Sequence, residues 1–388
     1  MADTSSDLRI LWLGPLHSDA AIARRRAANP AAAVWTRGLL GGLRKNGASV
    51  AGLTHCYEQS WPQGDFWPGG KAEFDAEIRP SFIRYPNIAR LREPYLCRAY
   101  ARRVRELLRS GRFDAVVCYN TLHPYHVAAL RVASELSVPC FPIILDADDP
   151  RADGWAAIRH ETQYASGVVF LSYWAACNYP GAVPTLHLDG GAPYWRGDWE
   201  DSILDEGRVV YTGALDHYRG IAFLAAVVRQ LPACGWRLVL CGRSDREQVR
   251  KLFGDDERVV FKGFVDDAEL HEICSRAALF ISMRPPEVRE NIMNFPSKIS
   301  HYLSYGKPVV STWIDSFHPD YRGLLQVVSD EDPRAFAAAI TDVLAWGLER
   351  RTEFRDRVRD WFTANKLWER QASRLLGWMK ERSHGGVA

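Results

Sequence analysis

The chain has 388 residues, of which 47% are hydrophobic and 25% charged, and its formal net charge is +2. This length fits two domains better than one core, and the composition excludes a fibrous or disordered protein. The small net charge excludes a strong overall attraction to nucleic acid. The start lacks the basic segment of a signal peptide, and no uncharged apolar run reaches the ~18 residues of a membrane span, so we expect a cytoplasmic protein.

The eight cysteines form no C-x-x-C pair and have no zinc-ligand spacing with histidine. Most of them lie in apolar runs, such as Cys118 in AVVCY and Cys241 in LVLCG. We therefore expect buried free thiols rather than a metal or redox site, which favours a reducing compartment.

In the N-terminal half, apolar runs of strand length alternate with helical patterns, as is typical of parallel βαβ units. An aromatic, Gly- and Pro-rich stretch at 56–70 predicts a long surface loop. The predicted strands are 8–16, 48–54, 115–119, 140–145 and 167–171, and the predicted helices are 32–46, 95–110 and 125–136.

The segment 189–207 is rich in Gly and acidic residues and has no period, so we predict the interdomain linker there. The alternation then restarts, which predicts a second doubly wound α/β sheet with its ligand groups at the carboxyl ends of its strands. Its predicted strands are 208–211, 237–241, 259–261, 279–282 and 308–311, and its predicted helices are 221–231, 246–253, 268–277, 297–305, 333–349 and 352–380.

The stretch 295–311, FPSKISHYLSYGKPVVS, is the most informative motif. Pro296 and Ser297 suit the start of a helix, with Ser297 as its cap. The unpaired N–H groups of the first turn, together with the charge of Lys298, suit a bound diphosphate. From these residues alone, an ordinary capped helix with a solvated lysine is the alternative.

Together with RVVFKGFVDD at 258–267, this stretch resembles the donor-binding core of retaining GT-B glycosyltransferases of the family-four type, the glycosyl transferases group 1. The resemblance spans residues 205–380 and, more loosely, 8–190. It implies two Rossmann-like domains facing a central cleft. We therefore expect an acceptor domain at 1–190, a nucleotide-sugar donor domain at 191–365 and a helix at 366–388 that crosses back to the acceptor domain.

The resemblance also implies which residues bind the donor. A Gly-rich turn with a basic residue follows the first strand of such domains, here Gly213 and Arg219 in TGALDHYRG. Phe264 stands in the turn that contacts the base in relatives. Ser297 and Lys298 would bind the diphosphate.

Two further arginines follow predicted strands of the same half, Arg243 in CGRSD and Arg284 before Pro285. Their positions favour contacts with the nucleotide, phosphate or sugar, and solvated loop arginines are the alternative.

The chain departs from the family pattern at two acidic positions. The family usually has glutamates where this chain has Met293 and His301. Either the ribose is held differently, by His301 or Asn294, or the donor is unusual.

In the N-terminal half, polar residues follow two predicted strands. His123 comes after AVVCY, and a histidine there can bind a sugar hydroxyl or move a proton; a structural role is the alternative. Asp148 and Asp149 follow the next strand, in LDADDP. They could position an acceptor or take its proton; a divalent cation site or a solvated loop are the alternatives.

Basic residues also gather in the N-terminal half. An insert at 17–33 contains three consecutive arginines, Arg24, Arg25 and Arg26, which we expect to line the acceptor site. From Arg84 to Arg112 there are nine arginines and two glutamates. This segment suits anionic lipid headgroups or an acidic acceptor, and an ordinary surface helix is the alternative.

These features predict a hexosyltransferase that moves a sugar from a nucleotide-diphosphate sugar, UDP-linked, to a small-molecule, glycan or lipid-linked acceptor. The resemblance implies retention of configuration and no metal or other cofactor, with the leaving phosphate helping to deprotonate the acceptor. No nucleic-acid partner is expected. The alternatives are a nucleotide-sugar epimerase of the same fold and a non-catalytic nucleotide-sugar-binding protein. A peripheral position at the inner face of the membrane is the alternative to a free cytoplasmic one.

Overall fold

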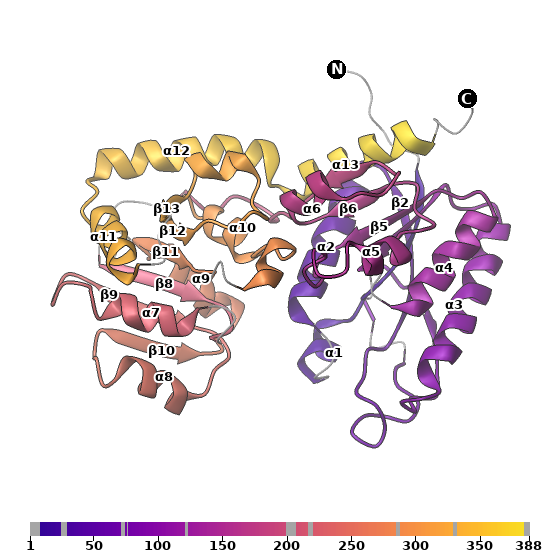
Figure 1. The fold of residues 1–388 in the computed structure, drawn as a ribbon, viewed down its shortest axis with the longest axis horizontal. Helices are drawn as coiled ribbons and strands as arrows, with labels where there is room; N and C mark the ends of the chain where they lie inside the picture. The colour runs from indigo at the N-terminus through magenta and orange to yellow at the C-terminus, as the bar shows by residue number, and fades with distance from the viewer. Residues whose placement is uncertain are drawn as a thin grey trace. The chain divides into compact units, whose positions relative to one another are not determined.

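The computed structural model describes residues 8–24, 29–70, 74–75, 77–120, 123–198, 207–215, 220–284, 288–328 and 332–383. The chain divides into two compact units, and each is described by itself (Figure 1). One unit combines Met1–Gly191 with Trp368–Ala388, and the other is Ala192–Leu367.

The first unit is built on a seven-stranded sheet in the order β3-β2-β1-β4-β5-β6-β7, and every neighbouring pair is parallel. The order reverses between β1 and β4, as in a Rossmann sheet. The strands are β1 Arg9–Leu13, β2 Ser49–His55, β3 Ser81–Ile83, β4 Ala115–Tyr119, β5 Cys140–Ile144, β6 Val168–Phe170 and β7 Thr185–His187. The helices are α1 Asp19–Arg24, α2 Pro30–Lys45, α3 Arg92–Arg109, α4 Pro124–Glu135, α5 Ala156–Glu161, α6 Tyr173–Asn178 and α13 Trp368–Ser383.

The C-terminal helix α13 is joined to the first unit through a close contact with α2. A Cβ atom at Gly38 would overlap the ring of Trp368, and one at Gly42 would overlap its backbone. The ring of Trp35 meets that of Trp368 edge-to-face at 5.6 Å. Two glycines four residues apart lie on one face of a helix, so they allow α13 to approach the backbone of α2.

The second unit is built on a six-stranded sheet in the order β10-β9-β8-β11-β12-β13, again parallel throughout. The strands are β8 Arg208–Thr212, β9 Arg237–Cys241, β10 Val259–Gly263, β11 Leu279–Ser282, β12 Val309–Thr312 and β13 Gln326–Val328. The helices are α7 Ile221–Val228, α8 Arg246–Phe253, α9 Asp267–Ser275, α10 Lys298–Leu303, α11 Pro333–Leu344 and α12 Leu348–Asn365, with 3-10 turns η4 Arg289–Ile292 and η5 Pro319–Gly323.

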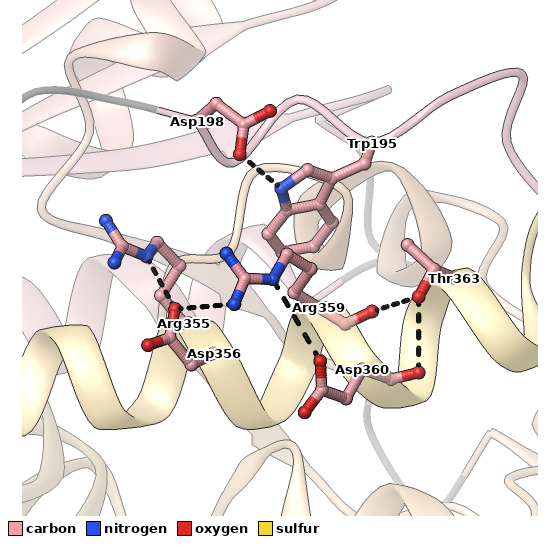
Figure 2. Close-up of polar contacts among 7 residues, drawn as sticks. All are labelled: Trp195, Asp198, Arg355, Asp356, Arg359, Asp360 and Thr363. Atoms are coloured by element: carbon pink, nitrogen blue, oxygen red, sulfur yellow. Dashed lines mark hydrogen bonds and ion pairs between the residues drawn. The ribbon is translucent and has the colours of Figure 1, made fainter.

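The segment after Gly191 is fixed to α12 by Trp195 (Figure 2). The indole N–H of Trp195 donates to Asp198 at 3.2 Å, and its ring lies 5.7 Å from that of Phe362. A Cβ atom at Gly306, where φ is +64°, would lie 2.9 Å from the Trp195 ring and 2.8 Å from Cγ of Arg355. Gly306, which follows α10, is therefore required both by its backbone angle and by this packing.

The two predicted doubly wound sheets are confirmed, and every predicted strand is present. The predicted helix 352–380 is wrong: α12 ends at Asn365 and α13 begins at Trp368, because Leu367 pairs with Ala192 between them. The predicted helix 333–349 likewise ends early, at Leu344. The elements without a prediction, namely β3, β7, β13, α1, α5 and α6, have three to six residues each. Such elements are too short for a periodic pattern.

All eight cysteines are free, and five of them are buried. Burial raises the pKa of the Cys140 thiol to about 12 and, with a nearby carboxyl of Glu269, that of Cys241 to about 11. These thiols are protonated at neutral pH and serve the core, as the sequence predicts.

Candidate functional site

Four of the predicted donor-binding residues lie at one edge of the second sheet. Gly213 follows β8, Arg243 follows β9, Phe264 follows β10 and Arg284 follows β11. In a parallel sheet the carboxyl ends of all strands share one edge, and the order reverses here between β8 and β11. Ligands of doubly wound sheets bind at this edge, next to the reversal. We call it the donor edge.

Two glycines make the backbone compact at the donor edge. Gly213, with φ of +120°, donates its N–H to the carbonyl of Cys241 at 2.9 Å. Gly242, the residue after β9, has a φ of +149°, and a Cβ atom there would overlap the carbonyl of Gly213. A Cβ atom at Gly213 would meet nothing within 4 Å, so the turn after β8 is open on that side and closely packed on the side of Gly242.

Lys298, the first residue of α10, reaches the end of β8. Its ammonium lies 3.8 Å from the centre of the Tyr211 ring, a cation–π distance. One turn further, the hydroxyl of Tyr302 accepts from the backbone N–H of Thr212 at 2.7 Å. These two contacts, made by residues four apart on one face of α10, fix that helix against the last two residues of β8.

The predicted cap at Ser297 is wrong. Its φ of −51° and ψ of −24° are helical, and its side chain makes no capping hydrogen bond. A capping side chain needs extended backbone angles to reach the N–H groups of the first turn. Ser297 is an exposed residue instead.

Asn294 stands just before α10 and is half-buried. Its carbonyl accepts from Ser316 at 3.1 Å, whereas its side-chain oxygen is buried without a hydrogen bond from the part of the chain that the structure describes. A buried amide oxygen without a donor is costly, so this atom suits a donor from a ligand or water.

Arg284 is fastened to the ends of two strands. Its backbone N–H donates to the hydroxyl of Thr312, and that hydroxyl donates to the Arg284 carbonyl, both at 2.9 Å. Its guanidinium donates to the amide oxygen of Asn291 at 3.4 Å. Arg284 thus lies at the ends of β11 and β12, at the donor edge.

Arg243 and Phe264 lie together at the donor edge. The Arg243 guanidinium is 5.4 Å from the centre of the Phe264 ring, and that ring is 73% exposed. Such an aromatic face in water, beside a cation, can stack on a base or a sugar. Arg219, the remaining predicted donor residue, lies outside the described residues.

His301 points to the neighbouring helix α9. Its Nε2 lies 4.0 Å from the sulfur of Cys274, and its ring packs edge-to-face on Tyr305 at 5.3 Å. Burial, with the nearby charges of Arg196 and His271, lowers the pKa of His301 to about 4. The imidazole is neutral at pH 7, so it replaces a family carboxylate with an uncharged group.

In the first unit, His123 is the N-cap residue before α4, which follows the end of β4. Its imidazole stacks on the Tyr125 ring at 5.0 Å, and His126 lies 6.0 Å away. Desolvation lowers the pKa of His123; Glu93 opposes this shift and Arg92 adds to it. The residue as a whole is exposed, and the lowered pKa favours a neutral imidazole at pH 7.

The two predicted catalytic aspartates have different surroundings. Asp149 is held by the guanidinium of Arg151, with contacts of 2.9 and 2.8 Å to its two oxygens. Asp148 is exposed. Asp149 is therefore committed to an ion pair, and Asp148 presents its carboxylate to solvent.

The arginine-rich segment forms α3, whose buried stripe consists of Leu96, Tyr100, Val104 and Leu108. Arg84, Arg90, Arg98, Arg102 and Arg109 are exposed. In the insert, Arg24 ends α1, while Arg25 and Arg26 lie outside the described residues.

Across the described ranges, no helix is long and apolar enough to cross a membrane. Within those same ranges, no three His, Cys, Asp or Glu side chains come together in an arrangement that could hold a metal ion.

A family model matches part of the second unit. Residues 206–345 match the model of the family described as Glycosyl transferases group 1. We call residues 206–345 the group 1 segment because they match this family model. This group 1 segment contains the donor edge from β8 to β12, so the resemblance seen in the FPSK block is confirmed. A search of curated protein sequences found no match.

Solved structures similar to the whole chain have the GT-B fold, and so does this chain. Anabaena HepE in complex with UDP and glucose has 13% identity and a TM-score of 0.66, with 96% of this chain and 99% of that chain covered. The lipopolysaccharide outer core galactosyltransferase WaaB has 11% identity and a TM-score of 0.65, covering 96% and 100%. A putative UDP-N-acetylglucosamine 2-epimerase from Listeria monocytogenes has 12% identity and a TM-score of 0.61, covering 98% of both chains.

The sequence did not single out several residues of the donor edge. Tyr211 looked like a core residue because it ends an apolar strand, and Thr312 lies just past the predicted strand 308–311. Gly242, between a strand and Arg243, carried a usable signal, since Gly after a strand marks a close backbone approach.

Proposed function

We propose that the chain is a glycosyltransferase that moves a hexose from a UDP-linked sugar to an acceptor, with retention of configuration and without a metal or other cofactor. The observation that carries this proposal is the position of Lys298, held by Tyr211 at the donor edge of a group 1 segment. The complex of HepE with UDP and glucose, a protein of the same fold, supports the choice of uridine.

In this proposal the sugar–phosphate bond breaks as the acceptor oxygen bonds the anomeric carbon. Negative charge then grows on the leaving diphosphate, and the ammonium of Lys298 with the guanidinium of Arg284 stabilises it. The acceptor proton passes to the leaving phosphate. Asn294 offers its buried oxygen to a donor hydroxyl, and Phe264 with Arg243 offers a face to the base.

The acceptor is proposed to bind the first unit, where His123 and Asp148 present a neutral imidazole and a carboxylate. Asp149 would act on the acceptor indirectly, by holding the guanidinium of Arg151 in place. We also propose a peripheral contact of α3 with anionic lipid at the inner face of the membrane, which suits a lipid-linked acceptor.

Incubation with a panel of nucleotide sugars tests the proposal. A glycosyltransferase without its acceptor hydrolyses its donor slowly, so UDP and free sugar should appear with one UDP-sugar, unchanged by EDTA. The anomeric form of the first sugar released, followed by NMR, tests retention. Formation of a new nucleotide sugar would favour the epimerase alternative, which the Listeria likeness keeps open. No turnover, despite binding, would favour a non-catalytic protein in which Met293 and His301 replace needed acids.

A further inference from the structure

A pocket of about 260 Å³ in the first unit lies apart from the residues that the proposed reaction uses. It is lined by residues of α1 and α2 and by Asp75, Glu77 and Ile78, which precede β3. Neither His123 nor Asp148, the proposed acceptor contacts, lines it. A concave site with converging polar groups is where a small ligand is expected to bind.

The face of α2 that lines the pocket has a bare centre. Arg37, Gly41 and Arg44 follow one another at spacings of four and three residues, so they share one face of the helix. A Cβ atom at Gly41 would meet no atom within 4 Å. A glycine inside a helix is destabilising relative to alanine, and neither a close approach nor a positive φ accounts for this one. What Gly41 provides is open space between two arginines about 10 Å apart along the helix axis.

Hydrogen bonds fix the acidic part of the lining. The Oδ1 atom of Asp75 accepts from the backbone N–H of Glu77 at 2.8 Å and from that of Ile78 at 3.1 Å. The guanidinium of Arg44 donates to the carbonyl of Glu77 at 3.4 Å, which joins this turn to α2. Both acidic residues thus keep their place beside the helix.

The charges of the lining do not cancel. Arg37 is paired with Asp19 of α1 at 2.6 Å, which leaves the carboxylates of Asp75 and Glu77 with the guanidinium of Arg44. Within the part of the chain that the structure describes, no ion pair includes any of these last three residues. One negative charge therefore remains, and it favours a ligand that carries one positive charge.

We propose that this pocket binds an amino sugar, that is, a sugar ring with a protonated amine. The ammonium group pairs with the carboxylates of Asp75 and Glu77. Each ring hydroxyl can both donate and accept, so hydroxyls suit a lining that holds carboxylates and the guanidinium of Arg44 together. The apolar face of the ring packs on Leu40, over the open space at Gly41. An anion fits less well because carboxylates outnumber guanidinium groups, and this inference does not depend on the proposed transferase reaction.

A ligand-observed NMR titration of the full chain with glucosamine, at about pH 6.5 where its amine is protonated, tests the proposal. Wild type should bind glucosamine about tenfold more tightly than glucose or N-acetylglucosamine, which lack the charge. Gly41→Leu places a side chain in the open space and should weaken binding about tenfold or more. Its matched control is Gly377→Leu, because Gly377 is an exposed glycine of α13 whose Cβ atom would also meet nothing within 4 Å.

A second variant, Glu77→Gln, keeps the shape of an exposed side chain and removes its charge. It should weaken glucosamine binding about fivefold in low salt and less at about 1 M salt, where charges are screened. Melting curves show that each variant is folded, and Gly41→Leu should melt no lower than wild type because leucine favours a helix more than glycine does.

Three results would overturn the proposal: equal binding of glucosamine by wild type and Gly41→Leu, equal affinity of wild type for glucosamine and glucose, or no binding of glucosamine at about 50 mM. Tighter binding of inorganic phosphate than of glucosamine would assign the pocket to an anion instead. The titration contains no nucleotide sugar, so its failure would leave the proposed transferase activity untouched.

Discussion

Gly306→Ala should destabilise the second unit by more than a change of backbone freedom alone explains. A residue with a side chain at φ of +64° costs about 1–2 kcal/mol. The new Cβ atom would also lie 2.9 Å from the Trp195 ring, which Asp198 and Phe362 hold in place. Overpacking of this kind costs about 1–3 kcal/mol, so we expect a total loss of about 2–5 kcal/mol in the free energy of unfolding.

Gly111→Ala is the matched control, because Gly111 has φ of +65° and open space around its missing Cβ. Its cost should be about 1–2 kcal/mol. Urea unfolding of both variants measures the difference, and a double-mutant cycle with Trp195→Ala should recover the packing part. Equal losses for Gly306→Ala and Gly111→Ala, or no coupling to Trp195, would refute the close packing of Gly306 on that ring.

Three further predictions concern the second unit. Burial lowers the pKa of His301 to about 4 from an ordinary 6.5, so the stability that the neutral ring contributes is complete above pH 6.5 and is lost as the pH falls toward 4. In urea melts across this window, the free energy of unfolding of wild type should fall by about 3 kcal/mol more than that of His301→Gln. Arg351→Met should lower the free energy of unfolding by about 3 kcal/mol or more, because the buried Arg351 side chain donates to four backbone carbonyls. The control is Arg350→Met, a change at the exposed neighbouring residue, which should cost under about 1 kcal/mol in the same melts. Gly242→Ala should shift the carbonyl of Gly213 and weaken UDP binding by calorimetry, and unchanged affinity would contradict the compact turn at the donor edge.

The fold could be predicted because its strands are continuous buried runs. AVVCY at β4 and RLVLC at β9 are apolar nearly throughout, as strands covered on both faces must be. The alternation of such runs with helical patterns then leaves few arrangements besides doubly wound sheets. The break between α12 and α13 escaped prediction because it depends on the pairing of Leu367 with Ala192, far away in the sequence.

The sequence predicts where the residues of the candidate site lie in the fold, but not which contacts their side chains make. Gly213, Arg243, Phe264 and Arg284 all follow strands, so their common edge follows from the alternation alone. The cap at Ser297 failed because it depends on the backbone angles of one residue.

Packing between elements decides the state of His301, which became an uncharged, largely buried ring because α9 covers it. That contact has no local signal in the sequence. The ion pair of Asp149 with Arg151 does have one, since the two residues stand two positions apart in the same loop.

The central claim is that a nucleotide diphosphate binds at the donor edge beside Lys298, and a thermal-shift screen of UDP, GDP, ADP and TDP tests it most directly. A ligand at about 100 times its dissociation constant stabilises the folded state by about 2.7 kcal/mol. We predict that UDP raises the melting temperature of wild type and of Lys262→Ala, an exposed lysine of the same unit, but not of Lys298→Ala. An equal shift in Lys298→Ala, or no shift with any of the four nucleotides, would contradict the claim.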